Sequence, residues 1–141
     1  MHDCTNHAWA DYDRDGDLDL LVTRRSDGQQ VHLWRNDVGQ DNNWATFRLV
    51  GDGSASNTLA CGARVTLVSG DLTQIREVQC GRGHATSQPS IAVEFGLGAR
   101  TTIDSVSVDW PGGTNESWDD PPIKRFILLE QGNGSIGFYD E

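Results

Sequence analysis

The chain has 141 residues, with 21 acidic and 11 basic side chains, and its formal net charge is −10. A chain of this length can bury a hydrophobic core, so neither a metal nor a disulfide is obligatory for folding. The negative charge opposes binding to nucleic acids and anionic lipid surfaces. No segment approaches the about 20 apolar residues of a membrane-spanning helix. We therefore expect no nucleic-acid partner and no membrane insertion.

The N-terminus shows neither the basic nor the apolar region of a signal peptide. Met1 is followed at once by a polar stretch and then by a complete acidic motif, so we expect the chain to be the C-terminal part of a longer protein, with any export signal upstream. His2, Cys4 and His7 resemble soft metal ligands, but a zinc site normally needs a fourth ligand and a rigid frame. We interpret this stretch as a frayed terminus.

The segment DYDRDGDLD contains five aspartates at alternate positions, with Gly16 at the sixth position; the aspartates are Asp11, Asp13, Asp15, Asp17 and Asp19. Ca²⁺ prefers six to eight oxygen ligands, and calcium loops supply them from positions 1, 3 and 5, from a backbone carbonyl at 7 and from later carboxylates. The spacing predicts one Ca²⁺ held by four carboxylates and by the Asp17 carbonyl. Mg²⁺ fits less well because it requires a rigid octahedron.

An EF-hand would require flanking helices and a Glu at position 12, but Val22 stands there within a β-type run. The EF-hand interpretation therefore fails. The remaining alternative is an acidic turn exposed to solvent.

Short β-type runs separated by Gly, Asp, Asn and Ser recur along the chain, whereas helix signals are scarce. The pattern predicts an all-β protein. The predicted strands cover residues 19–23, 31–35, 44–50, 63–68, 73–79, 91–95, 103–110, 125–130 and 135–139. Apolar residues alternate at 91, 93 and 95 and again at 106, 108 and 110, as expected of strands with one buried face.

A polar stretch over residues 36–43 precedes the longer β series, so we place a domain boundary near residue 40. Residues 40–141 are expected to form an antiparallel β-sandwich or barrel-like domain. Residues 1–39 are expected to form a strand pair with the calcium loop, docked on that domain because two isolated strands are only marginally stable.

Cys61 and Cys80 lie on either side of a predicted hairpin that turns near residues 69–71, so they can face each other across paired strands. A disulfide in an oxidising compartment and two buried thiols are both compatible with this placement. Cys4 is left over, as a free thiol or one that has lost its partner to truncation.

His84 and Ser87 lack the surroundings of a nucleophile and base, since Gly-rich turns often carry such residues for hydrogen bonding. Trp118, within NESWDDPP, is the tryptophan in the most loop-like context. We therefore expect Trp118 to be a ligand or partner contact, because exposed aromatic faces can stack on sugars or proteins.

The segment AWADYDRDGDLDLLV resembles the calcium loop of an FG-GAP or VCBS repeat, the blade unit of integrin-type β-propellers. The segments NNWATFRLVG, SNTLACGARVTLVSG, QIREVQCGRGHATSQ, VEFGLG and VSVDWPGG resemble the ASPIC/UnbV domain of proteins related to cartilage acidic protein. Cys61, Cys80 and His84 depart from the pattern of that domain. The resemblance implies a β-rich, calcium-binding protein that is secreted or at the cell surface, and it offers no catalytic residues.

Together these observations predict a calcium-binding structural or adhesive module that is not an enzyme, with Ca²⁺ as its cofactor and a protein or polysaccharide partner outside the cell. The alternatives are a carbohydrate-binding module and an accessory or catalytic domain of a biosynthetic or hydrolytic enzyme. The sequence does not specify the oligomeric state.

Overall fold

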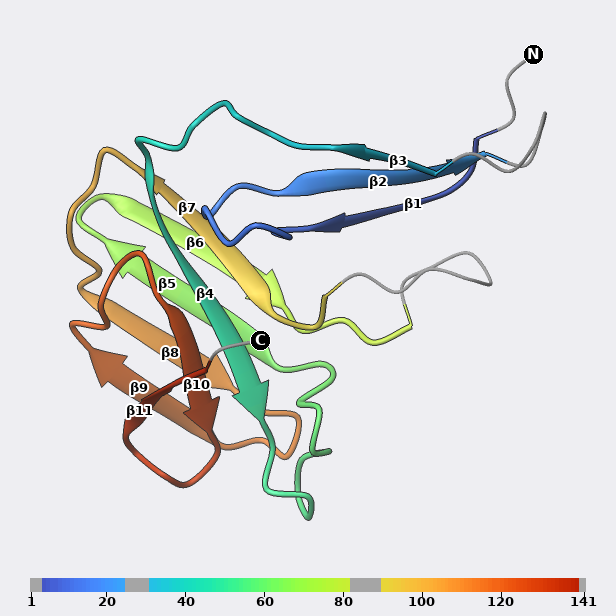
Figure 1. Ribbon diagram of the computed structural model, residues 1–141. Coiled ribbons are helices and arrows are strands. Elements are labelled where there is room, and N and C mark those ends of the chain that lie inside the picture. The colour runs from blue at the N-terminus through green and yellow to red at the C-terminus, as the bar shows by residue number, and fades with distance from the viewer. Residues whose placement is uncertain (1–3, 25–30, 82–89, 140–141) are drawn as a thin grey trace. The chain divides into compact units, whose positions relative to one another are not determined.

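The computed structural model describes residues 4–24, 31–81 and 90–139. Eleven strands and no helix occur in these ranges, so the all-β prediction is confirmed (Figure 1). No helix long and apolar enough to cross a membrane occurs in this part of the chain. The chain divides into two units, one comprising Met1–Gln40 and Gly81–Ser90 and the other Asp41–Cys80 and Ile91–Glu141. The domain boundary between residues 39 and 40 and the docking of the first segment stay predictions.

The first unit contains an antiparallel three-stranded sheet in the order β1-β2-β3. Its strands are β1 (Cys4–Ala10), β2 (Asp19–Arg24) and β3 (Val31–Trp34). The predicted strand pair is present as β2 and β3, and β1, which the sequence did not predict, adds a third strand by pairing with β2. The segment CTNHAWA lacks regular apolar alternation, so the partner strand rather than the local pattern accounts for this strand.

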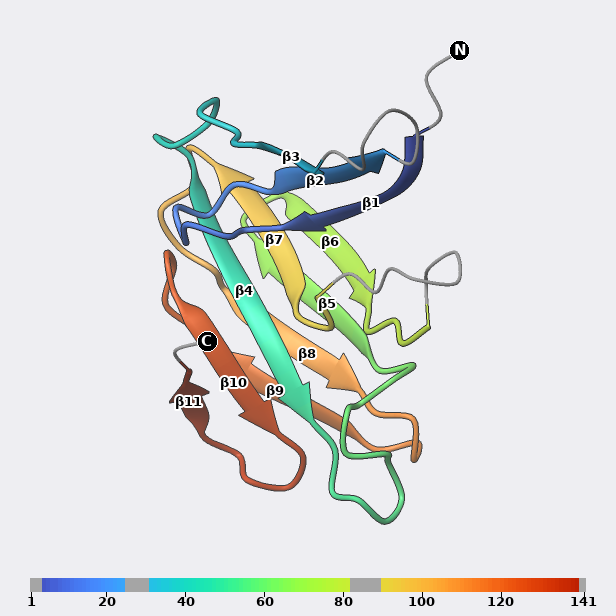
Figure 2. The same cartoon turned by 45° about the vertical axis from the view of Figure 1, so that its right-hand side comes forward.

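The second unit contains two four-stranded sheets. The first has the order β11-β10-β4-β7 and the second the order β6-β5-β8-β9. The strands are β4 (Asn43–Val50), β5 (Arg64–Ser69), β6 (Leu72–Glu77), β7 (Val93–Gly98), β8 (Ser105–Asp109), β9 (Asn115–Asp119), β10 (Phe126–Glu130) and β11 (Ile136–Phe138). The two sheets form opposed layers (Figures 1 and 2). The sandwich prediction is confirmed, and the described strands do not close into a barrel.

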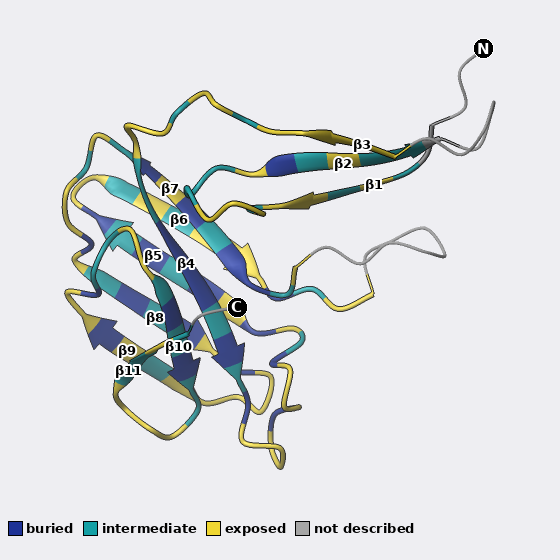
Figure 3. Ribbon diagram, in the orientation of Figure 1, coloured by how far each residue is buried: buried dark blue, intermediate teal, exposed yellow. Residues whose placement is uncertain are grey.

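Buried and more exposed residues alternate along β5, β7, β8 and β10 (Figure 3), and the buried positions carry the apolar side chains of the core. Phe47 of β4 and Phe95 of β7 are fully buried, and their rings meet edge to face with centroids 5.7 Å apart. Val65 of β5 and Val108 of β8 are cross-strand partners and fully buried in the opposite sheet. The alternation predicted for β7 and β8 therefore points toward the core, where burial contributes about 1.5–3 kcal/mol per large side chain.

One strand pair departs from the antiparallel prediction. β10 runs parallel to β4, with Phe126 opposite Thr46 and Glu130 opposite Val50. Parallel strands cannot be joined by a tight turn and need a longer crossover connection. Here the strands that lie between β4 and β10 in the chain supply that connection. The sheet is mixed because it contains both parallel and antiparallel strand pairs.

Candidate metal centre

The acidic segment forms the turn between β1 and β2. Ala10 at the end of β1 is paired with Asp19 at the start of β2, so the residues between them must reverse the chain direction. Gly16 has φ 95°, a left-handed conformation that glycine adopts without steric cost. Arg14 adopts φ 67°, which is uncommon for a residue with a Cβ atom. The reversal therefore depends on two left-handed residues within the acidic motif.

The side chains of Asp11, Asp13 and Asp15 converge inside this turn. One carboxylate oxygen from each lies within 4.8 Å of the other two. Two oxygens bound to the same Ca²⁺ cannot lie farther apart than twice the Ca–O distance, about 4.6–5.2 Å. The three carboxylates are therefore close enough to share one ion.

Backbone N–H groups hold two of these carboxylates in place. Asp11 Oδ1 accepts from the N–H of Asp15 at 3.1 Å, and its Oδ2 accepts from the N–H of Gly16 at 2.9 Å. Asp15 Oδ1 accepts from the N–H of Asp17 at 3.0 Å. Because the N–H groups of the turn point inward, the loop offers preorganised oxygens of fixed position rather than freely rotating carboxylates.

Asp19 is the buried acid of the motif, with 2% of its surface exposed. Its Oδ2 accepts from the N–H of Tyr12 at 3.1 Å, and its Oδ1 accepts from the N–H of Asn36 at 2.8 Å. These bonds connect the start of the turn with the segment that follows β3. A carboxylate oxygen that accepts one N–H keeps a second lone pair, so this role is compatible with the predicted role of Asp19 as a metal ligand.

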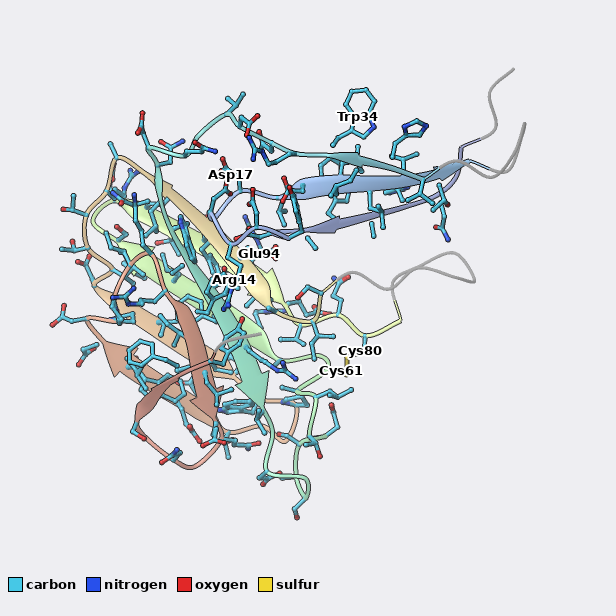
Figure 4. All side chains as sticks on the ribbon, in the orientation of Figure 1. Arg14, Asp17, Trp34, Cys61, Cys80 and Glu94 are labelled. Atoms are coloured by element: carbon cyan, nitrogen blue, oxygen red, sulfur yellow. A yellow bond between two sulfur atoms is a disulfide. The ribbon has the colours of Figure 1, made fainter. Side chains whose placement is uncertain are left out.

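Asp17 contributes more than the backbone carbonyl expected from its sequence position. Its Oδ2 is buried and has no hydrogen-bond partner among the described residues. Burial, followed by repulsion from Asp15, Asp19 and Asp13, raises the pKa of this carboxyl above 3.8. Burial also raises the pKa of Asp11. Figure 4 shows the Asp17 side chain at the turn. A carboxylate oxygen without a hydrogen-bond partner in this position is a suitable ligand for a cation.

The segment after β3 supplies polar side chains to the same loop. Gln40 donates from Nε2 to Asp15 Oδ2 at 3.1 Å. Arg35 is closer to Asp37, with 2.6 Å between Nε and Oδ1, than to Asp13 Oδ2 at 3.9 Å. No local pattern predicts the contact between Gln40 and Asp15, because the two residues lie 25 positions apart in the chain. The loop thus brings several side-chain oxygens close together, and oxygens are the ligands that Ca²⁺ sites use.

The predicted cysteine pair is confirmed as a disulfide. Cys61 and Cys80 are bonded, with their Cα atoms 5.5 Å apart (Figure 4). Two backbone hydrogen bonds lie between the disulfide and the β5–β6 hairpin. The N–H of Gly62 donates to the Val78 carbonyl, and the N–H of Val78 donates to the Ala63 carbonyl. The disulfide therefore closes the open end of the hairpin. The side chain of Cys4, and all of His2, His84 and Ser87, lie outside the described residues, whereas His7 is exposed in β1.

The expectation for Trp118 was wrong. Its segment is strand β9 rather than a loop, and the side chain is only 5% exposed because it faces the core opposite Val106. A side chain packed between two sheets cannot stack on a ligand at the surface. Trp34 and Trp9 are the exposed tryptophans of the described chain, at 63% and 47%.

The described chain thus combines a β-sandwich that carries one disulfide with a three-stranded sheet that carries an acidic turn. The family model described as ASPIC and UnbV matches residues 53–136. This is more than half of the chain, so the chain belongs to that family. The match covers strands β5 to β10 and leaves the acidic turn outside it. A comparison with curated proteins gives no match.

Proposed function

We propose that this chain is a calcium-binding structural module that acts by interaction rather than catalysis. The observation that carries the proposal is the convergence of the Asp11, Asp13 and Asp15 oxygens to within 4.8 Å, inside a turn whose backbone N–H groups orient the carboxylates. Asp17 Oδ2, buried and unpartnered among the described residues, adds a further donor. Asp19 and the Asp17 carbonyl complete the proposed ligand set.

A bound Ca²⁺ would neutralise repulsion among acids that lie close together in the turn. Protein oxygens would fill most of its six to eight positions, whereas a catalytic metal keeps an open position for substrate or activated water. The donor set therefore supports a stiffening role. In keeping with the resemblance of residues 7–36, we propose that this segment is the end of an FG-GAP or VCBS repeat.

We further propose that the protein acts outside the cell or on its surface, where it binds a protein or polysaccharide. Membership of the ASPIC and UnbV family and the Cys61–Cys80 disulfide are compatible with that location, because disulfides persist in oxidising compartments. The proposed calcium loop would then meet an environment in which Ca²⁺ is abundant.

Isothermal titration of the metal-free protein with Ca²⁺ tests the site. One ion should bind, and Asp15→Asn should weaken binding strongly while keeping an oxygen that can accept from Asp17. Asp119→Asn, an exposed aspartate on β9 far from the turn in sequence, is the matched control and should bind as the wild type does. Equal calcium affinities for wild type and Asp15→Asn would refute the site.

A further inference from the structure

The turn that joins β10 to β11 contains an asparagine that is followed by a glycine. Asn133 is the one asparagine of the 141-residue sequence with a glycine after it. Leu129 of β10 is paired with Ile136 of β11, so the turn occupies the short segment between them. Asn133 and Gly134 are both exposed in this turn. Because glycine has no Cβ, its backbone nitrogen is open to close approach by a neighbouring side chain.

The side-chain amide of Asn133 is held at both of its polar atoms. Its Nδ2 donates to Glu130 Oε2 at 2.8 Å, and its Oδ1 accepts from the Ser135 hydroxyl at 3.0 Å. The backbone N–H of Asn133 also donates to the Glu130 carbonyl at 3.1 Å. The hydroxyl draws electron density toward Oδ1, which makes the amide carbon Cγ more electrophilic. A donor in this position also stabilises negative charge that develops on the oxygen during attack at Cγ.

The backbone nitrogen of Gly134 is placed as the nucleophile for that carbon. Its N–H donates no hydrogen bond among the residues that the structure describes. Gly134 has φ 67°, and apart from its chain neighbours no atom lies within 4 Å of the position that a Cβ would take. The turn therefore combines an unhindered backbone nitrogen with a polarised amide on the preceding residue.

Asn115 offers an internal comparison, because its side chain is also hydrogen-bonded but its chain neighbour differs. Its Nδ2 donates to Asp109 Oδ1 at 2.7 Å. The next residue, Glu116, carries a side chain and lies in β9, where it is paired with Val108 of β8. The backbone nitrogen after Asn115 is therefore both more crowded and fixed in a sheet.

We propose that Asn133 is a site of spontaneous deamidation. The Gly134 nitrogen forms a bond to Cγ of Asn133, the bond between Cγ and Nδ2 breaks, and ammonia leaves. The proton of the Gly134 nitrogen passes to solvent, and solvent supplies the proton that leaves with the ammonia. Water then opens the resulting cyclic imide at either carbonyl, so position 133 becomes aspartate or isoaspartate. Water is the one co-reactant, no electrons are transferred, and the step does not depend on the calcium site.

The product would carry a negative charge where Nδ2 now donates. The Glu130 carboxylate, whose Oε2 is 2.8 Å from Nδ2, would then face a second carboxylate, and like charges at this distance repel. β11 is three residues long and lies at the edge of its sheet, beside β10 (Figure 2). Loss of the turn contact should therefore loosen β11 first. Deamidation would thus change this edge of the sandwich slowly and irreversibly.

The test follows the purified full chain during incubation at mildly alkaline pH, with peptide mass mapping and isoaspartate detection at intervals. Asn133 should be converted before Asn115. Ser135→Ala removes the hydroxyl and should slow the conversion about two- to tenfold, the effect of one hydrogen bond on a barrier. Synthetic peptides spanning residues 130–137, with and without the same change, are the matched comparison because they have the sequence without the folded turn. The slowing should be confined to the folded chain.

A second measurement tests the consequence for β11. Asn133→Asp introduces the charge of the product, and amide hydrogen exchange in β11 should accelerate while exchange in β5 should not change. Adding Glu130→Gln should restore slow exchange, because glutamine keeps a hydrogen-bonding group but carries no charge. Denaturant unfolding of each variant checks that the sandwich still folds, and both changed residues lie at the turn rather than in the core.

Three results would overturn the proposal or one of its parts. An intact Asn133 in the folded chain, under conditions that convert it in the peptide, would show that the turn protects the amide. Equal rates for the folded wild type and Ser135→Ala would rule out activation by the hydroxyl. Unchanged exchange in β11 of Asn133→Asp would rule out the effect on the edge strand.

Discussion

The carboxylate of Asp19 accepts hydrogen bonds from two backbone N–H groups that lie on opposite sides of it in the chain, those of Tyr12 and Asn36. At 2% exposure, Asp19 is far more buried than a typical aspartate. It thereby ties the acidic turn to the segment that follows β3. Both of these hydrogen bonds depend on the one Asp19 side chain and should be lost when it is removed.

Asp19→Ala should loosen the first unit even without metal. The change leaves two N–H groups without their acceptor, and an unsatisfied buried donor costs about 1–3 kcal/mol. In the presence of chelator, amide hydrogen exchange at Tyr12 and Asn36 should accelerate, while exchange in β4 and β10 should not change. Asp119→Ala serves as the control. Unchanged protection at both amides would contradict the role of Asp19.

Calcium should stabilise the chain by mass action. A ligand that binds only the folded state raises the free energy of unfolding by about 2.7 kcal/mol at a free concentration 100 times its dissociation constant. Thermal melts with calcium and with chelator should therefore differ for the wild type, and Asp15→Ala should remove the difference. Identical melts in all three samples would rule out a tightly held ion.

Loss of the Cys61–Cys80 bond should destabilise the sandwich. The bond closes a loop with a sequence separation of 19, for which the chain-entropy model gives about 3 kcal/mol. Cys61→Ser with Cys80→Ser should unfold at lower denaturant concentration than the wild type, whereas Cys4→Ser should not. Peptide mapping without reductant should recover the 61–80 bridge, and recovery of three free thiols after oxidative expression would contradict it.

Trp118 should be sensitive to truncation but tolerant of phenylalanine. Trp118→Ala removes a large buried side chain, for which the expected loss is about 3–5 kcal/mol. Trp118→Phe should cost less, because the buried Nε1 has no hydrogen-bond partner among the described residues and none is lost. Chemical denaturation of the two variants checks this order. A Trp118→Ala variant as stable as the wild type would restore a surface role for this residue.

Asp52 should make part of the stability depend on pH. Hydrogen bonds from the backbone N–H groups of Ser56 and Ser54 lower the pKa of Asp52 below 3.8. A lowered folded-state pKa means that the contribution is present above pH 3.8 and lost as the pH falls through the folded-state value.

The matching experiment compares the midpoint temperatures of the wild type and Asp52→Ala. The gap between them should be present at about pH 7 and should narrow at about pH 3 and below. Asp52→Asn keeps an acceptor that does not titrate, so the gap between Asp52→Asn and Asp52→Ala should hardly change with pH. A gap between wild type and Asp52→Ala that is constant with pH would show that the Asp52 carboxylate does not stabilise this loop.

Residue patterns within a single strand, hairpin or turn predicted those parts of the fold that depend only on residues close together in the chain. The alternation of Val93 and Phe95, and of Val106 and Val108, follows from the two-residue period of strands with one buried face. The cysteine pair was predictable because the intervening hairpin is local. The convergence of the acidic side chains also follows from residue spacing, since the turn brings Asp11, Asp13 and Asp15 together.

Features that depend on distant partners were not predictable. β9 is rich in Asn, Glu, Ser and Asp, which rarely favour strands, and it forms because β8 offers an edge on which Trp118 can be buried. The loop-like composition thus led to the wrong expectation for that tryptophan. The contact between Gln40 and Asp15 and the orientation of the Asp17 carboxylate likewise depend on how the turn closes, which residue spacing alone does not specify.

The parallel pairing of β4 with β10 has a consequence for synthesis on the ribosome. The 80 positions that separate Thr46 from its partner Phe126 take roughly 4–16 s to translate at 5–20 residues per second. During that interval the β10-facing edge of β4 has no partner, and unpaired strand edges invite association with other chains. The nascent domain therefore passes through an exposed stage that ends only when β10 has been made, and a chain terminated before Phe126 would keep this edge of β4 unpaired.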